Sequence, residues 1–261
     1  MIKIDVLFSP LLVDELSLRN KNIIIIDVLR ASTTIATALY NGAKEVIPVA
    51  SVESAVKVSG NLFGGAVIRG GERNGKIIEG FNLGNSPLEY TVEAVKGKSI
   101  IFCTTNGSPA MVKARYAKNM VIGSFVNMSK VVQFIRDAQE DVVIICAGKQ
   151  SAFCMEDAVC AGMMIKNITD ETEIQLNDSA VAAQTLYQTS AKSLLKMIKN
   201  CNHGQQLTEI GFQGDLKFCA AIDTIPVLPQ LIGNVIKLKK DELKITLDFN
   251  AENPNAIVNQ Q

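Results

Sequence analysis

The sequence has few of the residues that most often build metal or redox sites. It contains one histidine, His203, and no tryptophan. A single imidazole excludes metal sites with two or three histidine ligands, so catalysis must depend on carboxylates, arginines, hydroxyls or a thiol. Six cysteines are present, but none forms a C-x-x-C pair, which argues against a zinc ribbon or a redox dithiol.

Long apolar runs and an excess of one charge are also missing. No apolar stretch approaches the roughly 18 residues that a membrane span needs, and the N-terminal MIKIDVLFSP lacks the pattern of a signal peptide. Basic and acidic residues number 26 each, so the net charge is zero and nucleic acid is not an expected partner. We therefore expect a cytoplasmic protein without membrane partners, and a homo-oligomer is an open alternative to a monomer.

The stretch Asn22–Tyr40, NIIIIDVLRASTTIATALY, organises much of the chain. Its four consecutive isoleucines are too apolar for a strand with one wet face and indicate a strand buried on both sides. Asp27 ends the run, and Arg30, Ser32 and Thr33 follow before a helix continues. Because open α/β sheets bind ligands where a central strand ends beside a helix N-terminus, we expect an anion site here, with phosphate as the favoured ligand.

The polar residues of this loop suit such a site. Arg30 would donate two hydrogen bonds to phosphate oxygens, and the amides and hydroxyls of Ser32 and Thr33 would add donors at the positive helix end. Asp27 would repel a phosphate, so beside one it must bind a cation or attack the phosphorus. The plainer alternative is a helix-start carboxylate with a solvent-exposed arginine.

The chain then echoes this pattern. Residues 98–135 follow the same order of strand, polar loop, helix, Ala-Lys, strand and helix as residues 21–58. The echo suggests an internal duplication and places the loops 27–33 and 104–108 at equivalent strand ends. A third buried strand, 141–147, also ends in a polar loop, so we expect the three loops along one edge of a sheet.

These patterns predict an α/β fold with a layered, largely parallel or mixed sheet and helices on both faces. We expect an α/β core at residues 1–168 that carries most site loops, and a C-terminal α+β portion at 169–261 packed against it. The two could form one continuous domain. Near the C-terminus, Val235–Lys239 and Leu243–Asp248 predict a hairpin.

Other candidate residues lie between and within the repeated units. Glu72 and Arg73 belong to a glycine-rich GGER segment, where a surface turn and a metal-dependent phosphoryl site are equally good interpretations. Asn85 and Ser86 precede a helical start, and a capping box between Ser86 and Glu89 would explain that segment without a ligand. The second loop offers a cluster of donors at a strand end: Thr104, Thr105, Asn106 and Gly107.

The third strand end and the later chain add further groups. Cys146 could act as a thiolate only with a depressed pKa, and a buried structural cysteine is the favoured interpretation. Glu156 and Asp157 are adjacent, so on a helix they point about 100° apart and only one easily faces a site. One of them could bind Mg²⁺, which prefers carboxylates and water. His203, in a polar loop, could donate a proton or be an ordinary surface residue.

Several motifs resemble those of the 2-phosphosulfolactate phosphatase family. They are DVLRAST, GGER, GFNLGNSPLEY, TTNG, CAG followed by the Glu-Asp pair, and a later HG…L…GF…D segment, together within residues 23–229. The resemblance implies an α/β fold with layered sheets and a Mg²⁺-dependent hydrolase that releases phosphate from 2-phospho-3-sulfolactate. In some organisms this step lies on the route to coenzyme M. The family pattern points to Asp27, Arg30, Ser32, Glu72, Arg73, Asn85, Ser86, Thr104, Thr105, Asn106, Glu156 and Asp157.

We therefore predict a Mg²⁺-dependent phosphatase that acts on a small anionic phosphoester. The predicted catalytic residues are Asp27, Arg30 and Arg73. The predicted metal ligands are Asp27, Glu72, Glu156 and Asp157. The predicted substrate-binding residues are Ser32, Thr33, Asn85, Ser86, Thr104, Thr105, Asn106 and Gly107. The alternatives are a non-catalytic protein that binds a phosphorylated or sulfonated metabolite, and a weaker one, a thiol hydrolase that uses Cys146.

Overall fold

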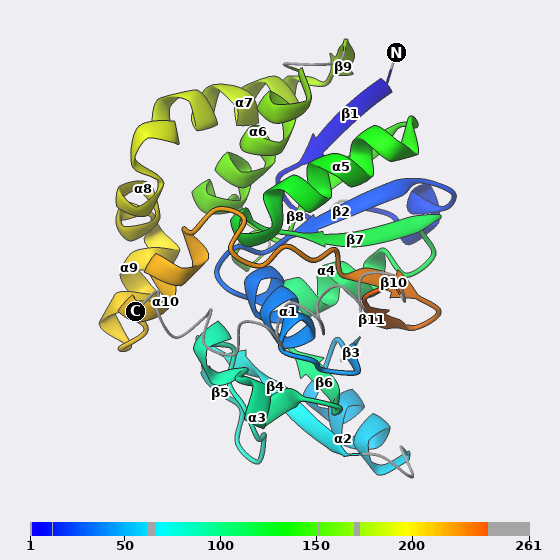
Figure 1. The fold of residues 1–261 in the computed structure, drawn as a ribbon, viewed down its shortest axis with the longest axis vertical. Coiled ribbons are helices and arrows are strands. Elements are labelled where there is room, and N and C mark those ends of the chain that lie inside the picture. The colour runs from blue at the N-terminus through cyan, green and yellow to red at the C-terminus, as the bar shows by residue number, and fades with distance from the viewer. Residues whose placement is uncertain (1, 12, 62–65, 151, 170–172, 240–261) are drawn as a thin grey trace, which may run out of the picture.

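The computed structural model describes residues 2–11, 13–61, 66–150, 152–169 and 173–239. In these residues, eleven strands form one sheet in the order β5-β4-β6-β3-β11-β10-β7-β2-β8-β1-β9 (Figure 1). Most neighbouring strands are parallel, and the antiparallel pairs involve β5, β10 and β11. The predicted α/β fold with a largely parallel sheet is confirmed.

The sheet consists of two halves joined by a hairpin. The first half-sheet contains β1 (Ile2–Leu7), β2 (Asn22–Ile26), β7 (Asn119–Gly123), β8 (Val142–Cys146) and β9 (Ile174–Leu176). The second half-sheet contains β3 (Glu45–Pro48), β4 (Val67–Arg73), β5 (Lys76–Ile77) and β6 (Ser99–Cys103). The hairpin strands are β10 (Gln230–Ile232), which pairs with β7, and β11 (Val235–Lys237), which pairs with β3.

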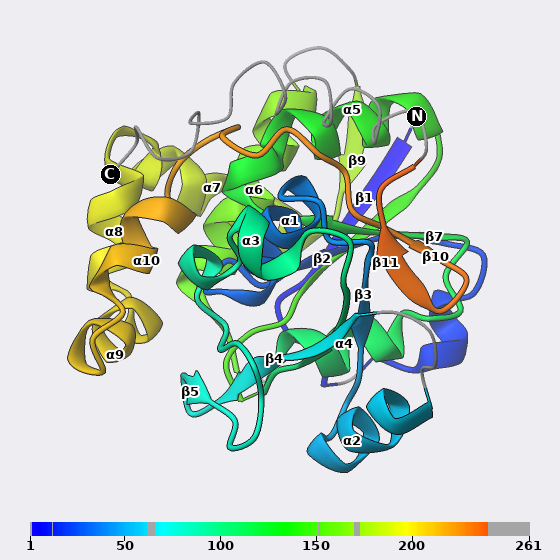
Figure 2. The same cartoon turned by 60° about the horizontal axis from the view of Figure 1, so that its bottom comes forward.

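Helices and half-sheets alternate as layers (Figures 1 and 2). The outer face of the first half-sheet is covered by α5 (Met128–Ala138), α6 (Met155–Thr169) and α7 (Asp178–Ser190). Between the half-sheets lie α1 (Ala31–Tyr40) and α4 (Gly107–Lys113). The outer face of the second half-sheet is covered by α2 (Val52–Asn61). This arrangement confirms helices on both faces of the sheet.

The remaining helices are short and lie around these layers. They are α3 (Val92–Val95), α8 (Leu194–Asn200), α9 (Asn202–Glu209), α10 (Gln213–Cys219) and the 3₁₀ helices η1 (Glu15–Leu18), η2 (Pro87–Glu89), η3 (Phe125–Asn127) and η4 (Ala191–Ser193). Helices α8, α9 and α10 gather beside the first half-sheet (Figure 1). No helix in the described ranges has the length and apolar character that crossing a membrane requires.

The four isoleucines of β2 explain its central position. Ile24 and Ile26 pack into the core beneath α5 and α6, whereas Ile23 and Ile25 pack into the core shared with α1 and α4. All four are fully buried, and β2 is flanked by parallel β7 and β8. Each buried isoleucine contributes about 1.5–3 kcal/mol of transfer free energy. The prediction of a strand buried on both faces is confirmed.

The two repeated units cross between the half-sheets in opposite directions. The first runs from β2 through α1 to β3, and the second runs from β6 through α4 to β7. The Lys44 N–H donates to the Lys98 carbonyl at 2.9 Å, and the Lys118 N–H donates to the Lys21 carbonyl at 3.0 Å. These reciprocal contacts support the internal duplication. Because β2 and β6 lie in different half-sheets, the expectation that all three loops lie along one edge of the sheet is wrong. The loops after β2 and β8 do share an edge, since these strands are parallel neighbours.

The C-terminal segments belong to the same sheet. β9 pairs with β1 at one end, and the β10–β11 hairpin lies between β3 and β7. The structure places β11 between β10 and β3, and the hairpin of Val235–Lys239 with Leu243–Asp248 stays a prediction. Its predicted second strand, Leu243–Asp248, lies outside the described residues.

The GGER segment ends strand β4 and is not a surface turn. Gly71 pairs beside Cys103 of β6 with a φ of +143°, and a Cβ at this position would overlap the Cys103 carbonyl. Glycine therefore allows β4 to run directly against β6. This pairing places Glu72 and Arg73 on opposite sides of a strand, because successive side chains alternate.

Candidate active site

A cavity lies where the loops after β2, β4, β6 and β8 meet α9. Of the predicted residues, it is lined by Asp27, Arg30, Glu72, Asn85, Thr105 and Asn106. His203, considered above as a proton donor, also lines it. The other lining residues, which the sequence analysis did not single out, are Leu29, Asn74, Gly75, Lys149, Gln150, Gln206 and Leu207.

Asp27 is a buried carboxylate at this cavity, with 6% of its surface exposed. Its Oδ1 accepts a hydrogen bond from the Ala31 N–H at 3.2 Å. Burial, together with the charges of Glu72 and Glu156, raises the pKa of Asp27 to about 6, although His203 and the Ala31 N–H act in the opposite direction. Asp27 therefore takes up a proton more readily than an ordinary aspartate and is ionised above about pH 6.

The hydroxyl groups after Asp27 hold the loop together. Ser32 Oγ accepts the Asp27 N–H at 2.8 Å and donates to the Ile25 carbonyl at 3.4 Å. Thr33 Oγ1 donates to the Val28 carbonyl at 3.1 Å. Both side chains are fully buried and neither residue lines the cavity. The structure therefore does not bring Ser32 and Thr33 to a ligand, because their hydroxyls are used within the loop.

Arg30 is engaged by the protein itself. Its Nη1 donates to Asp215 Oδ2 at 2.7 Å and its Nη2 donates to the Gly75 carbonyl at 2.7 Å. The guanidinium carbon lies 4.2 Å from the ring centroid of Phe212. Arg30 and Asp215 are each 2% exposed, so this is a buried ion pair. The Arg30 guanidinium, which was predicted to donate to two phosphate oxygens, instead donates to a carboxylate and a carbonyl. Arg30 still lines the cavity.

Asp215 was missed in the site prediction, and it also explains Ser86. Ser86 Oγ donates to Asp215 Oδ1 at 2.7 Å and makes no capping hydrogen bond at η2. Glu89 Oε2 accepts the N–H of Gly84 at 2.5 Å, so the predicted capping box is wrong. Asp215 is the final residue of the GF…D segment, and that motif was the available signal for it.

Glu72 is positioned by two backbone amides. Its Oε1 accepts the Thr105 N–H at 2.7 Å, and its Oε2 accepts the Gly75 N–H at 2.8 Å. Arg73 points to the other side of β4, where its Nη2 donates to Cys103 Sγ at 3.2 Å. Arg73 does not line the cavity, so the structure separates it from Glu72.

The loop after β6 contains residues that bond within the loop and two residues, Thr105 and Asn106, that line the cavity. The Thr104 N–H donates to Ser108 Oγ, and the Ser108 N–H donates to Thr104 Oγ1, each at 3.0 Å. Thr104 is thus buried within the loop and does not reach the cavity. Gly107 does not line the cavity either, but a Cβ there would lie only 2.6 Å from Asp27 Oδ2. Glycine at this position leaves room for the Asp27 carboxylate.

Among the described residues, three side-chain oxygens from cavity-lining residues are buried and have no hydrogen-bond partner. They are Asn85 Oδ1, Thr105 Oγ1 and Gln206 Oε1. Such atoms normally have a partner, so they indicate a bound group. Together with the carboxylates of Asp27 and Glu72, they form a set of oxygen donors that fits a hard cation such as Mg²⁺.

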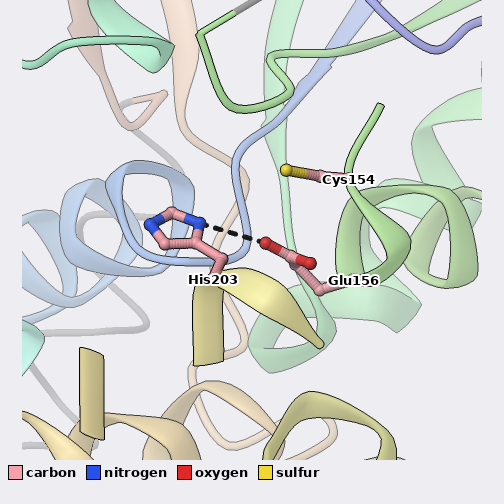
Figure 3. A group of neighbouring side chains, drawn as sticks. All are labelled: Cys154, Glu156 and His203. Carbon is pink, nitrogen blue, oxygen red and sulfur yellow. Dashed lines mark hydrogen bonds and ion pairs between the residues drawn. The ribbon is translucent and has the colours of Figure 1, made fainter. Parts of the chain in front are cut away.

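A second donor group lies beside α9. His203, the second residue of α9, places Nδ1 3.1 Å from Glu156 Oε1 in the first turn of α6. Cys154 Sγ lies next to this pair, and the three ligand atoms are within 4.8 Å of one another (Figure 3). Burial opposes ionisation of Glu156, but the hydrogen bond and charge of His203 hold its pKa below the usual value. Sulfur and nitrogen donors favour zinc-type ions over Mg²⁺.

Asp157 points away from this group, as expected for a neighbour on the same helix. Its Oδ1 accepts the Val28 N–H at 2.9 Å and its Oδ2 accepts the Gly148 N–H at 3.1 Å. Burial, and then the charges of Glu156 and Asp27, raise the pKa of Asp157 well above its usual value. Asp157 joins the loops after β2 and β8 and does not line the cavity, so the structure does not present it as a metal ligand.

Cys146 lies in the core at the end of β8 and is 1% exposed. Burial, with the nearby charge of Asp157, raises the pKa of its thiol well above the usual value. A nucleophilic thiolate requires the opposite shift. The structure therefore contradicts the thiol-hydrolase alternative and agrees with a structural cysteine.

Comparison with known proteins identifies the family. The model of a family described as 2-phosphosulpholactate phosphatase matches residues 8–234. The chain belongs to the 2-phosphosulfolactate phosphatase family. The resemblance noted in the sequence motifs is thus confirmed.

Proteins named probable 2-phosphosulfolactate phosphatase are similar over most of the chain. That of Caldanaerobacter subterraneus subsp. tengcongensis is 39% identical over 229 residues, which cover 88% of this chain and 95% of the relative. That of Clostridium tetani is 38% identical over 235 residues, 90% of this chain and 99% of the relative. That of Thermotoga maritima is 38% identical over 217 residues, 83% of this chain and 92% of the relative.

Proposed function

We propose that this member of the 2-phosphosulfolactate phosphatase family is a Mg²⁺-dependent enzyme that hydrolyses 2-phospho-3-sulfolactate to 3-sulfolactate and phosphate. The observation that carries the proposal is the buried Asp27 carboxylate, which lines a cavity with Glu72 and three residues with unpartnered oxygens. The names of the relatives support the same reaction class.

Asp27 and Glu72 would hold Mg²⁺, and the unpartnered oxygens of Asn85, Thr105 and Gln206 are the neutral donors available beside them. When bound, the cation supplies charge neutralisation at the phosphoryl oxygens and polarises the phosphorus centre. Glu156 is occupied by His203 and belongs to a softer donor group. We therefore leave it out of the proposed Mg²⁺ ligands.

The chain's own residues supply the positioning that phosphoryl transfer requires. The Thr105 and Gly75 amides hold Glu72 from both sides. The Arg30–Asp215 pair, with Ser86 bonded to the second Asp215 oxygen, joins the loops after β2 and β5 to the first turn of α10. These groups are ordered by the fold, so little entropy is lost when substrate binds.

Asp27 can act in one of two ways. As a nucleophile, its carboxylate oxygen attacks phosphorus, the bond from phosphorus to the ester oxygen breaks, and the departing alkoxide takes a proton from solvent water. Water then hydrolyses the aspartyl phosphate. If Asp27 serves only as a metal ligand, it stays unmodified and water attacks phosphorus directly. Acid quenching during turnover, followed by mass spectrometry, decides between them, because only the first route leaves phosphate on Asp27.

The proposed activity is tested by phosphate release from 2-phospho-3-sulfolactate. We expect activity to vanish in chelator and to return when Mg²⁺ is added back in excess. Lys57→Met, an exposed change on α2, is the matched control and should leave activity unchanged. Full activity in chelator would refute the role of the metal. Tight binding without phosphate release from any of a panel of phosphoesters would favour the non-catalytic binding protein.

A further inference from the structure

We propose that Lys149, with the neighbouring amides of Gln150 and Asn106, forms a subsite for the sulfonate group of the substrate. This subsite would bind an organic anion that takes no part in the reaction. The inference rests on the proposed function, since it assigns a specificity determinant to the same cavity. It does not concern the phosphate or the metal.

The charge balance of the cavity points to Lys149. Among the described residues that line the cavity, Arg30 is the only arginine and Lys149 is the only lysine. The charge of Arg30 is already compensated, because Asp215 lies 2.7 Å away in a buried ion pair. The Lys149 side chain makes no hydrogen bond or ion pair with any residue in the described ranges. Its ammonium group is therefore available to an anionic ligand.

The loop that carries Lys149 is held in place before any ligand arrives. Lys149 and Ala152 exchange two backbone hydrogen bonds of 3.1 and 2.9 Å. Gly148, which precedes them, has a φ of +66° and donates its N–H to Asp157 Oδ2 at 3.1 Å. A Cβ on Gly148 would overlap the Ala152 carbonyl, so this turn requires glycine. A fixed loop restricts the entropic cost of binding mainly to the lysine side chain.

The lining also divides by chemistry. Asp27 and Glu72 supply carboxylates, which suit a cation and repel an anion. Elsewhere in the lining, the Gln150 N–H donates to Asn106 Oδ1 at 2.8 Å, which joins the Lys149 loop to the loop after β6. This part of the lining contributes an ammonium and two side-chain amides but no carboxylate.

The proposed substrate carries more than one anionic group and therefore needs more than one binding region. A phosphosulfolactate carries a phosphate, a carboxylate and a sulfonate, and the cation proposed at Asp27 and Glu72 would account for the phosphate. A charged lysine with amide donors offers charge-assisted hydrogen bonds to a second anionic group. Among small phosphoesters, this arrangement would favour those with a sulfonate beside the reacting ester.

The test compares two substrates that differ in the sulfonate. Steady-state kinetics are measured with 2-phospho-3-sulfolactate and with 2-phospholactate for the wild type, Lys149→Met, Lys149→Arg and the control Lys57→Met. Hydrogen bonds to charged groups contribute about 1.5–3 kcal/mol, so Lys149→Met should raise KM for the sulfonated substrate about 10- to 100-fold. KM for phospholactate and kcat for both substrates should change little, and Lys149→Arg should restore part of the preference. An equal rise in KM for both substrates, or no change for either, would overturn the assignment.

A binding measurement separates this inference from the proposed activity. Calorimetric titration of the Mg²⁺-loaded protein with 3-sulfolactate and with lactate requires no turnover. We expect 3-sulfolactate to bind at least about 10-fold more tightly, and Lys149→Met to remove that preference. If the preference is present but no phosphoester is hydrolysed, the proposed function fails and the subsite stands. If hydrolysis proceeds and Lys149→Met keeps the full preference, the subsite alone is refuted.

Discussion

The loops after β2 and β6 share one construction but carry different tasks. In each, a serine near the start of the following helix accepts the N–H of the first loop residue and donates to the carbonyl two residues before it. The serines are Ser32 and Ser108, and the first loop residues are Asp27 and Thr104. The duplicated scaffold therefore provides the same backbone twice, between two half-sheets.

The difference lies in the side chains that this backbone presents. Asp27 lines the cavity, whereas the Thr104 hydroxyl bonds within its own loop. The helix after the first loop begins with Ala31, and the helix after the second begins with Gly107, where a Cβ would meet Asp27. One copy thus carries the reactive carboxylate, and the other supports it by leaving space and by holding Glu72 through the Thr105 amide.

The strongest test replaces the first residue of each loop. Asp27→Asn should lower kcat by about 10³-fold or more, because a lost nucleophile or metal ligand costs several kcal/mol of transition-state stabilisation. Thr104→Val should cost about 1–2 kcal/mol of unfolding free energy and leave kcat nearly unchanged. Steady-state kinetics and urea unfolding measure the two effects. A folded Thr104→Val protein as inactive as Asp27→Asn would erase the proposed division between the loops.

The variants Asp27→Asn and Thr104→Val should also differ in how their unfolding free energy depends on pH. Because the pKa of Asp27 is raised from 3.8 to about 6, the folded protein binds this proton more tightly than the unfolded chain between those values. Its carboxylate therefore lowers the unfolding free energy as pH rises through that interval, by up to about 3 kcal/mol above pH 6. In metal-free buffer, Asp27→Asn should stabilise the protein at pH 7 and lose this gain near pH 4. Thr104→Val should show no such trend. Urea titrations at several pH values measure it, and a pH-independent gain in Asp27→Asn would contradict the raised pKa.

A side chain at position 107 would remove the space that the loop after β6 leaves for the Asp27 carboxylate. In Gly107→Ala, the new Cβ would lie 2.6 Å from Asp27 Oδ2 and 2.7 Å from Ala31 Cβ, so the carboxylate must move. A displacement of about 1 Å in an active site can cost about 10²-fold, and we expect a 10- to 100-fold loss of kcat. Gly60→Ala in α2 is the control, since nothing lies within 4 Å of its Cβ position. Unchanged kcat in Gly107→Ala would show that Asp27 does not need this space.

The smallest effects should come from the shared serines. Ser32→Ala and Ser108→Ala each leave one buried loop N–H without its acceptor, so each should lower the unfolding free energy by about 1–3 kcal/mol. Only Ser32→Ala should also reduce kcat, by several-fold, because it loosens the residue that carries the carboxylate. Parallel unfolding and kinetic measurements compare the pair. A greater loss of kcat in Ser108→Ala than in Ser32→Ala would reverse the assignment of roles.

Local sequence patterns determined the scaffold of this protein. The isoleucine run required a strand buried on both faces, and the structure divides its side chains between two cores. The repeat of strand, loop and helix predicted the equivalence of the loops that begin at Asp27 and Thr104. Such features are encoded by neighbours along the chain, because periodicity, caps and strand ends depend on adjacent residues.

Only the tertiary structure decided which polar groups meet. Asp215 binds Arg30 across 185 positions of sequence, and it also takes the Ser86 hydroxyl that a local capping box would have used. Glu156 meets His203 across 47 positions, and Lys149 reaches the cavity through a turn built on Asp157. A buried charge must find a partner wherever the packed helices and loops bring one within reach, and that choice is made only when α9 and α10 close over the strand ends.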